Sequence, residues 1–264
     1  MYVMAEVSSI SRVGKTEPFE LQIARGQISF HKTNFKFGFN PDIDNSLETV
    51  WAEGGLYSYL SSASVLKISS SSTDDTSAGT GARTVQISGL DANYDEITES
   101  ITLNGQTAVN TTNEYLRVNR ANVLTAGTGG QNAGVIYAGT GTVTSGVPAN
   151  KYTTIAIGDN QSLMALWTVP RGYTAYLYQT NVTAACTTSN KLLTTTIVAR
   201  SFDSVFQVKD KFGIQIDGGS IVQKYNFPLK FEEKTDIEVR AISDAGSANA
   251  EVSAGLDFLY IRNP

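Results

Sequence analysis

Apolar and polar side chains alternate along most of this chain, and this alternation limits the possible folds more than any other feature. In RTVQISGLD, Val85 and Ile87 alternate with polar neighbours, and further on Ile97, Ile101 and Leu103 share one parity. A period of two residues is that of a β-strand. No window keeps apolar residues at the helical i, i+3, i+4, i+7 spacing for long. The sequence therefore predicts an all-β protein with less than about a tenth of its residues in helices.

Glycine and asparagine mark where the predicted strands end. Asn104-Gly105 is the strongest hairpin signal, because both central residues of a type I′ turn need a positive φ. The residues from Gly89 to Tyr94 are interpreted as a turn, and Gly26 and Gly38 interrupt apolar runs as turns or bulges would. Since no helix-length segments separate the strands, an antiparallel fold is expected rather than a parallel α/β sheet.

The 264 residues suit one large domain or two of ordinary size. A Gly-rich region ends near Pro148–Asn150, after which strands recur at the spacing of a sandwich. We therefore expect a polar N-terminal arm at residues 1–14, a β-sandwich module at residues 15–149 and a second one at residues 150–264. Long antiparallel chains of this kind close their edges as jelly rolls, sandwiches or barrels.

Composition limits the partners of the chain. The net charge is -5, and no clustered Lys and Arg provide a surface for nucleic acid or anionic lipid. No apolar run approaches the roughly 18 residues that span a bilayer, so no membrane partner is expected. The first ten residues lack a basic segment followed by an apolar one, so we expect no secretory signal and maturation inside the producing cell.

Only one histidine and one cysteine are available for catalysis, His31 and Cys186. Cys186 lies in the small-residue stretch NVTAACTT, and a buried small hydrophobe explains it better than a nucleophile. His31 would have to serve any Ser-His-Asp triad or His-based metal site, and an ordinary strand or loop histidine explains it better.

Three acidic segments are candidates for a metal-binding or catalytic site. The NPDIDN segment (Asp42, Asp44, Asn45) resembles the start of a calcium loop, but its remaining ligands are absent, and we interpret it as a turn with side-chain-to-backbone hydrogen bonds. Asp74-Asp75 is interpreted as solvating a loop in which Gly79 and Gly81 supply positive φ. Asp95, Glu96 and Glu99 could supply a glycosidase pair, but nothing in the sequence marks a substrate pocket beside them.

No site residue is therefore predicted, neither catalytic, cofactor-binding nor metal-binding. The Gly-rich stretches GTGA, GTGG and GTGT lack the Lys of a phosphate loop, so no cofactor is expected either. By subtraction, the chain is predicted to be no enzyme. A depolymerase acting through carboxylates alone is the alternative from another class.

Residues 73–136 carry a resemblance. The runs DTSAGTGARTV, GLDANY, ESITLNG and GTGGQNAGVI resemble a segment common in virion structural proteins of tailed bacteriophages, and the later TVPRGYTAYLY looks like the strand that opens a second β module in them. The likeness covers roughly residues 60–180 and contains no catalytic signature. It implies jelly-roll-like β domains and self-association.

The resemblance implies a virion component, and size and shape favour a capsid decoration (cement) protein on the outer surface of the virion, assembled in the host cytoplasm. A compact pair of β modules with a polar N-terminal arm can clamp adjacent capsomers. Its expected partners are the major capsid protein and further copies of itself, as a homotrimer on a local threefold axis. The alternative is a neck or tail structural protein, such as an adaptor or fibre anchor, or a receptor-binding fibre component. The 12 Tyr and 11 Phe residues suit extensive interfaces.

Overall fold

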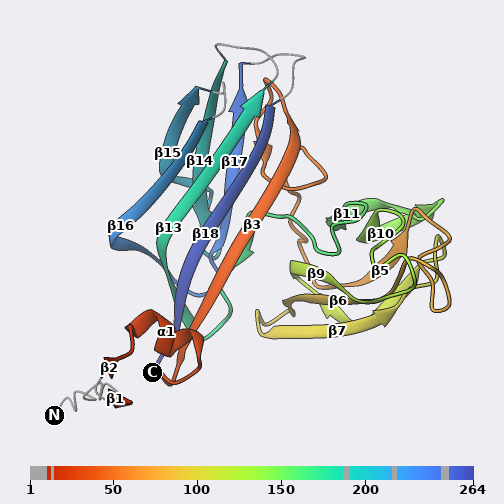
Figure 1. The fold of residues 1–264 in the computed structure, drawn as a ribbon, viewed down its shortest axis with the longest axis horizontal. Coiled ribbons are helices and arrows are strands. Elements are labelled where there is room, and N and C mark those ends of the chain that lie inside the picture. The colour runs from red at the N-terminus through yellow and green to blue at the C-terminus, as the bar shows by residue number, and fades with distance from the viewer. Residues whose placement is uncertain (1–10, 13–14, 187–190, 216–218, 245–249) are drawn as a thin grey trace.

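Almost every regular element of the computed structural model is a β-strand (Figure 1). The single helix of the described residues, α1 (Phe19–Ala24), is six residues long. The predicted all-β class and low helix content are therefore confirmed. In this part of the chain no helix has the length and hydropathy needed to cross a membrane. The structure describes residues 11–12, 15–186, 191–215, 219–244 and 250–264.

The N-terminal arm predicted at residues 1–14 lies outside the described residues, apart from two positions. These form β1 (Ser11–Arg12), which pairs with β2 (Lys15–Thr16) as a short antiparallel ribbon. The ribbon lies beside α1, close to the C-terminal end of the chain (Figure 1).

Two sheets form a large sandwich. One has the strand order β16-β13-β18-β3, and the other has the order β12-β17-β14-β15 with β4 paired to β17. The strands pair antiparallel throughout. Their bounds are β3 (His31–Ile43), β4 (Glu48–Thr49), β12 (Leu166–Thr168), β13 (Tyr173–Cys186), β14 (Leu192–Arg200), β15 (Gln207–Gln215), β16 (Gly219–Phe231), β17 (Asp236–Ser243) and β18 (Ala250–Arg262).

The inward residues of these strands form one core. Leu177, Leu256 and Val239 are fully buried in it. Trp167 packs against Phe258 and Tyr260, with ring centroids 5.0 and 5.2 Å apart. The alternation in the sequence places these side chains between the two sheets, as burial of one strand face requires.

A small sandwich projects sideways from the large one (Figure 1). One sheet has the order β11-β10-β5-β8 and the other β7-β6-β9. Its core includes Leu66, Ile87, Tyr115 and Ile136, each at most 1% exposed. The bounds are β5 (Ser64–Ser70), β6 (Ala82–Leu90), β7 (Glu96–Thr102), β8 (Val109–Tyr115), β9 (Arg117–Ala126), β10 (Ile136–Thr144) and β11 (Val147–Ile155).

The turn at Asn104-Gly105 is present but joins no hairpin. Gly105 has φ 59°, and Thr107 N–H donates to the Asn104 carbonyl over 3.1 Å. The turn connects β7 to β8, which lie in different sheets. The hairpin prediction was wrong because the turn residues fix only the local reversal, with a positive φ at Gly105 but not at Asn104, while the partner of each strand is set by the packing of the two sheets.

Strand pairing does not follow a division at residue 150. β3, near the start of the chain, pairs along its length with β18, whereas residue 150 lies inside β11 of the small sandwich. The small sandwich is therefore an insertion between β4 and β12 of the large one. Alternation reveals that a segment is a strand but carries no signal for a partner more than 200 residues away.

Gly38 lies inside β3 and forms neither a turn nor a bulge. A Cβ at this position would overlap the backbone of Val50 and Ala165. The segments around these two residues cross β3 here, and Met164 N–H donates to the Phe37 carbonyl over 3.0 Å. Glycine is required by close backbone approach rather than by a turn. Gly26, in contrast, has φ 68° and lies in a turn, as expected, but the turn follows the helix α1 rather than a strand.

Candidate functional site

His31 and Cys186 lie far apart in ordinary strand positions. His31 begins β3, with Nδ1 2.8 Å from the Ser29 carbonyl oxygen and its ring edge-on to Phe19. Cys186 ends β13, half-buried against the core of the large sandwich. The interpretation of both as structural residues fits these positions.

The turn predicted at NPDIDN begins only at Asp44, because residues 40–43 are the end of β3. The Asp44 carboxylate accepts the Ser46 N–H over 2.6 Å, and the Asp42 N–H donates to the Asn40 side chain. Asn45 is exposed in the same turn. In the described part of the chain, no three His, Cys, Asp or Glu side chains lie close enough together to hold a metal ion.

Asp75 departs from the prediction for its loop. It is fully buried, and its carboxylate accepts hydrogen bonds from the Ser70 hydroxyl and from three backbone N–H groups, over 2.6–2.9 Å. Gly79 and Gly81 do not have positive φ. Instead, a Cβ on either would overlap the Asp74-Asp75 segment. Asp75 thus ties three segments of the small sandwich together, whereas Asp74 is exposed as expected.

Asp95, Glu96 and Glu99 each accept hydrogen bonds from groups of the protein. Asp95 accepts two hydrogen bonds from Arg171, over 2.6 and 2.9 Å. Glu96 accepts one from Lys32, and Glu99 accepts the N–H groups of residues 112 and 113. The Asp95 and Glu96 contacts connect the small sandwich to the large one, so these carboxylates join the two parts.

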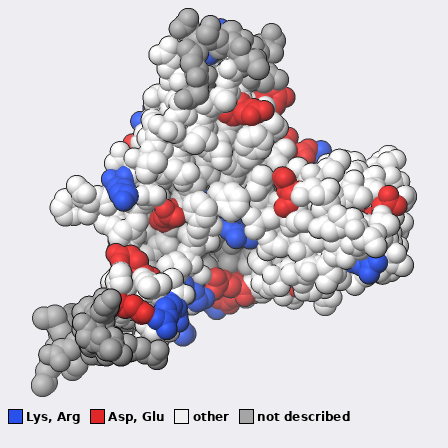
Figure 2. Space-filling view, in the orientation of Figure 1, with Lys and Arg blue, Asp and Glu red and all other residues white. Residues whose placement is uncertain are grey.

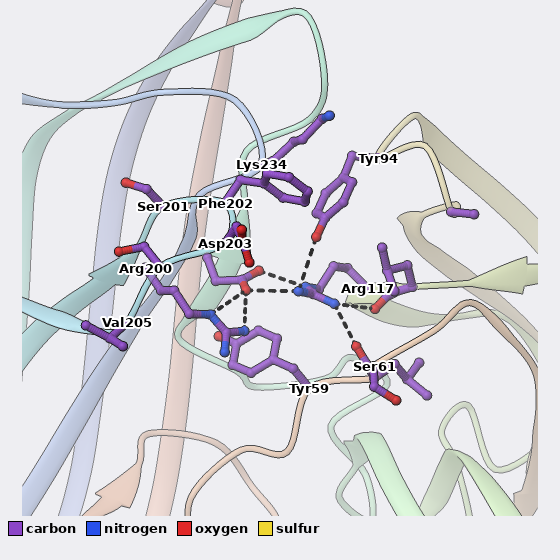
Figure 3. Close-up of a pocket in the computed structure, with 15 residues that line it drawn as sticks. Tyr59, Ser61, Tyr94, Arg117, Arg200, Ser201, Phe202, Asp203, Val205 and Lys234 are labelled. Carbon is purple, nitrogen blue, oxygen red and sulfur yellow. Dashed lines mark hydrogen bonds and ion pairs between the residues drawn. The ribbon is translucent and has the colours of Figure 1, made fainter.

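The centre of the connection between the sandwiches is Asp236, the first residue of β17, which is only 2% exposed. Arg117, the first residue of β9, donates to both its oxygens over 2.7 and 3.0 Å. Arg200, at the end of β14, donates over 2.6 Å, and the Thr168 hydroxyl donates over 2.6 Å. One buried carboxylate therefore holds two guanidinium groups, one from each sandwich (Figure 3).

Aromatic rings surround these cations. Tyr59, in the segment between β4 and β5, contacts both Arg117 and Arg200, whose guanidinium carbons are 5.0 and 4.8 Å from its ring centroid. Tyr94, in the turn between β6 and β7, covers Arg117 from the other side at 5.5 Å. Positive charge above a ring face is attracted by the ring quadrupole, which stabilises this stack.

The stack continues at both ends. Phe206 lies 4.7 Å from Arg200 and 4.5 Å from Arg240, and Lys234 lies 4.9 Å from the ring of Phe202. Arg240 also forms an ion pair with Glu238, which is completely buried on β17. Both ends belong to the large sandwich, so the small sandwich contributes only the middle of the stack.

Burial and charge together set the ionisation of these groups. Burial lowers the pKa of Arg117, but hydrogen bonds and charge from Asp236 outweigh it and raise the pKa above its ordinary value. Burial raises the pKa of the Tyr59 hydroxyl well above its usual range, and it raises the pKa of Glu238 against the opposing effect of Arg240. Arg117 is therefore a permanent cation, and Tyr59 is a neutral hydrogen-bond donor.

A cavity of about 730 Å³ opens beside this stack, and we call it the joint cavity. Figure 3 shows it between the β6–β7 turn of the small sandwich and the loop at residues 201–205 of the large one. Aromatic rings, cations and serine hydroxyls share its walls. The lining residues are Tyr59, Leu60, Ser61, Ala92, Tyr94, Leu116, Arg117, Arg200, Ser201, Phe202, Asp203, Ser204, Val205, Lys234 and Asp236.

Sequence reasoning missed this site completely. Arg117 and Asp236 are separated by 119 positions, and neither lies in a recognisable motif. The arrangement brings charged groups of the two sandwiches together and joins them.

Comparisons with known proteins found no matching family model and no matching curated protein. Among solved structures, the chain is similar to the VP2 subviral particle of infectious bursal disease virus, with 11% identity over 89% of this chain and 72% of that one and a TM-score of 0.24. The Gt strain of the same virus gives 11% identity, 88% and 71% coverage and a TM-score of 0.22. At these values the matches assign neither a family nor a function.

Proposed function

We propose that this chain is a structural protein of a tailed-bacteriophage virion, and more specifically a capsid decoration protein that stabilises the major capsid shell. In this proposal it lies on the outer surface of the shell as a homotrimer and contacts the major capsid protein. It assembles in the host cytoplasm, without a cofactor and without enzymatic activity.

The observation that carries the proposal is the buried joint at Asp236. The Asp236 side chain is only 3% exposed, and a protein is strongly destabilised when a buried ion pair loses one partner. Separation of the two sandwiches would break this pair, so they are held in one fixed arrangement. A protein that bridges neighbouring subunits needs such a fixed distance between its contact surfaces. The sequence resemblance to virion structural proteins supports the same reading.

The surface also suits contact with neighbours. Figure 2 shows single charged residues scattered over a largely uncharged face. Large apolar side chains are exposed on β15 and β16, away from the small sandwich: Val208 and Val222 are each 62% exposed, and Phe227 is 90% exposed. β15 and β16 are the outer strands of the two sheets and contact each other, so exposed apolar side chains on them favour a surface for protein–protein contact. Many weak contacts of this kind gain strength from the repeated sites of a shell.

The carboxylates that would serve a depolymerase support the non-enzymatic reading. Arg171 holds Asp95, and two backbone N–H groups hold Glu99, so each carboxylate is engaged within the protein. A glycosidase needs one acid and one base free to face the same substrate bond. Release of reducing sugar from a host glycan, abolished by Glu99→Gln, would overturn this part of the proposal.

The test uses the purified full-length chain and capsid shells that lack it. We expect the chain to be trimeric by light scattering, to sediment with the shells and to raise their resistance to heat. A variant without Met1–Gly14 is expected to fold and trimerise but to fail to bind shells, since the arm is proposed to clamp neighbouring subunits. Sedimentation with isolated tails and not with shells would contradict the decoration role and favour a neck or tail station.

A further inference from the structure

We propose that the joint cavity binds an acidic saccharide, with a sugar ring against Phe202 and its carboxylate on the ammonium of Lys234. This inference goes beyond the structural role proposed above and does not depend on it.

The first argument is charge. Three cations line the cavity, Arg117, Arg200 and Lys234, against the carboxylates of Asp236 and Asp203. The Asp236 carboxylate is already saturated by five hydrogen bonds from Arg117, Arg200 and Thr168.

Lys234 forms no ion pair with any residue that the structure describes, and its ammonium lies 5.7 and 4.9 Å from the ring centroids of Tyr94 and Phe202. Positive charge therefore exceeds negative charge at the cavity wall. A carboxylate from outside would compensate this excess.

The second argument is the exposed aromatic ring. Phe202 is 60% exposed even though it contacts Tyr94 edge-on, at a centroid distance of 5.9 Å. An exposed ring face in a concave site attracts weakly positive C–H groups, because the face carries the negative part of the ring quadrupole. The apolar face of a pyranose presents such groups.

The third argument is the supply of hydrogen-bonding groups. Ser61, Ser201 and Ser204 line the cavity. The volume of about 730 Å³ lies within the roughly 300–1,000 Å³ range of ligand sites.

These features favour a sugar over an acidic peptide. A peptide carboxylate would use Lys234 but would leave the ring face of Phe202 and the hydroxyl groups without a matching partner. A ligand with a hydroxylated ring and one carboxylate matches all three kinds of group, and each unit of a polyuronate or polysialate has this composition.

The test is calorimetric titration of the full-length chain at an ionic strength of about 0.15 M, so that loose charge attraction is screened. The acidic probes are tetragalacturonate, a hyaluronan tetrasaccharide and trisialic acid. Maltotetraose is the neutral sugar, and tetraglutamate is the acidic peptide. We expect at least one acidic sugar to bind and the other two classes not to bind.

Two matched double variants locate the binding. Phe202→Ala/Lys234→Asn removes the ring and the cation at the cavity; Asn is chosen because Lys234 has φ 61°, which Asn tolerates. Phe227→Ala/Lys224→Asn makes the same kinds of change at exposed positions of β16. The cavity variant is expected to weaken binding by roughly tenfold or more, and the control variant to leave it unchanged.

The proposal is overturned if none of the acidic sugars binds, if maltotetraose binds as tightly, or if tetraglutamate alone binds. Equal affinities of the cavity variant and the wild type would overturn it as well. Unfolding curves of both variants confirm that each is folded. Because the titration needs no capsid, its failure would leave the decoration role untouched, and failure to bind shells would leave the cavity proposal untouched.

Discussion

Replacing Asp236 with Asn tests whether the two sandwiches are fixed by one buried charge. The change keeps the size of the side chain but removes the negative charge that Arg117 and Arg200 share. The Arg117 side chain is only 9% exposed, so its charge would remain buried without a counter-ion. The amide of the replacement side chain would also present a donor where the Asp236 carboxylate presents an acceptor.

The expected loss follows from burial. Removing one partner of a buried ion pair costs about 3–5 kcal/mol, because the other charge is left without compensation. For a chain of this size, 1 kcal/mol corresponds to a shift of roughly 2–4 °C in Tm. Asp236→Asn is therefore expected to lower Tm by roughly 6–20 °C, and to allow independent motion of the two sandwiches.

The structure offers a matched control. Arg171 and Asp95 form an ion pair of the same geometry between the same two sandwiches, but their side chains are 51% and 43% exposed. Asp95→Asn should therefore change the free energy of unfolding by only about 0.2–1 kcal/mol. Urea unfolding measures both variants, and limited proteolysis near Leu60 reports on the freedom of the connecting segment.

One result would refute the reasoning. If Asp236→Asn and Asp95→Asn lower the free energy of unfolding by the same small amount, burial at the joint does not hold the sandwiches together. A large loss for Asp236→Asn with unchanged proteolysis would show instead that the charge stabilises the large sandwich alone.

Three further substitutions have expected outcomes in thermal or urea unfolding. Gly38→Ala should lower the free energy of unfolding by about 1–3 kcal/mol or more, because the new Cβ would overlap backbone atoms of Val50 and Ala165. Gly213→Ala in β15 should leave it unchanged, because no atom lies within 4 Å of its Cβ position. Asp75→Ala should lower the free energy of unfolding by about 3 kcal/mol or more, because it leaves buried donors unpaired. The matched control Asp74→Ala, at the exposed neighbouring position, should change it by less than about 0.5 kcal/mol. Burial lowers the pKa of Lys36 well below 10.5, so the unfolded chain holds more protons between the lowered pKa and 10.5. Stability should rise with pH across that window, and Lys36→Met should abolish the rise; equal slopes in both proteins would contradict this.

The sequence predicted what depends on local pattern. Alternation around Val85 and Ile87 gave the strand β6, and both side chains are fully buried. The stretch between Gly89 and Tyr94 gave the turn to β7, in which Asp91 accepts two backbone N–H groups. Short-range sterics and hydrogen bonding decide such features, so the residues themselves carry the signal.

Features that depend on distant partners were not predictable. Asp75 resembles a loop carboxylate, because the residues that bury it, Ala133 and Gly134, come nearly sixty positions later. The pairing of β3 with β18 and the ion pair of Arg117 with Asp236 have the same property. Neither side of such a contact shows a pattern by itself, so only the folded chain reveals the joint.

Counting copies per particle tests the central proposal most directly. Quantitative gel densitometry of purified virions that contain this chain compares its band with that of the major capsid protein. A decoration protein on the shell should be nearly as abundant as the major capsid protein, because it occupies repeated sites over the whole surface. A few copies to a few dozen per particle would contradict the decoration role and place the chain at the neck or tail.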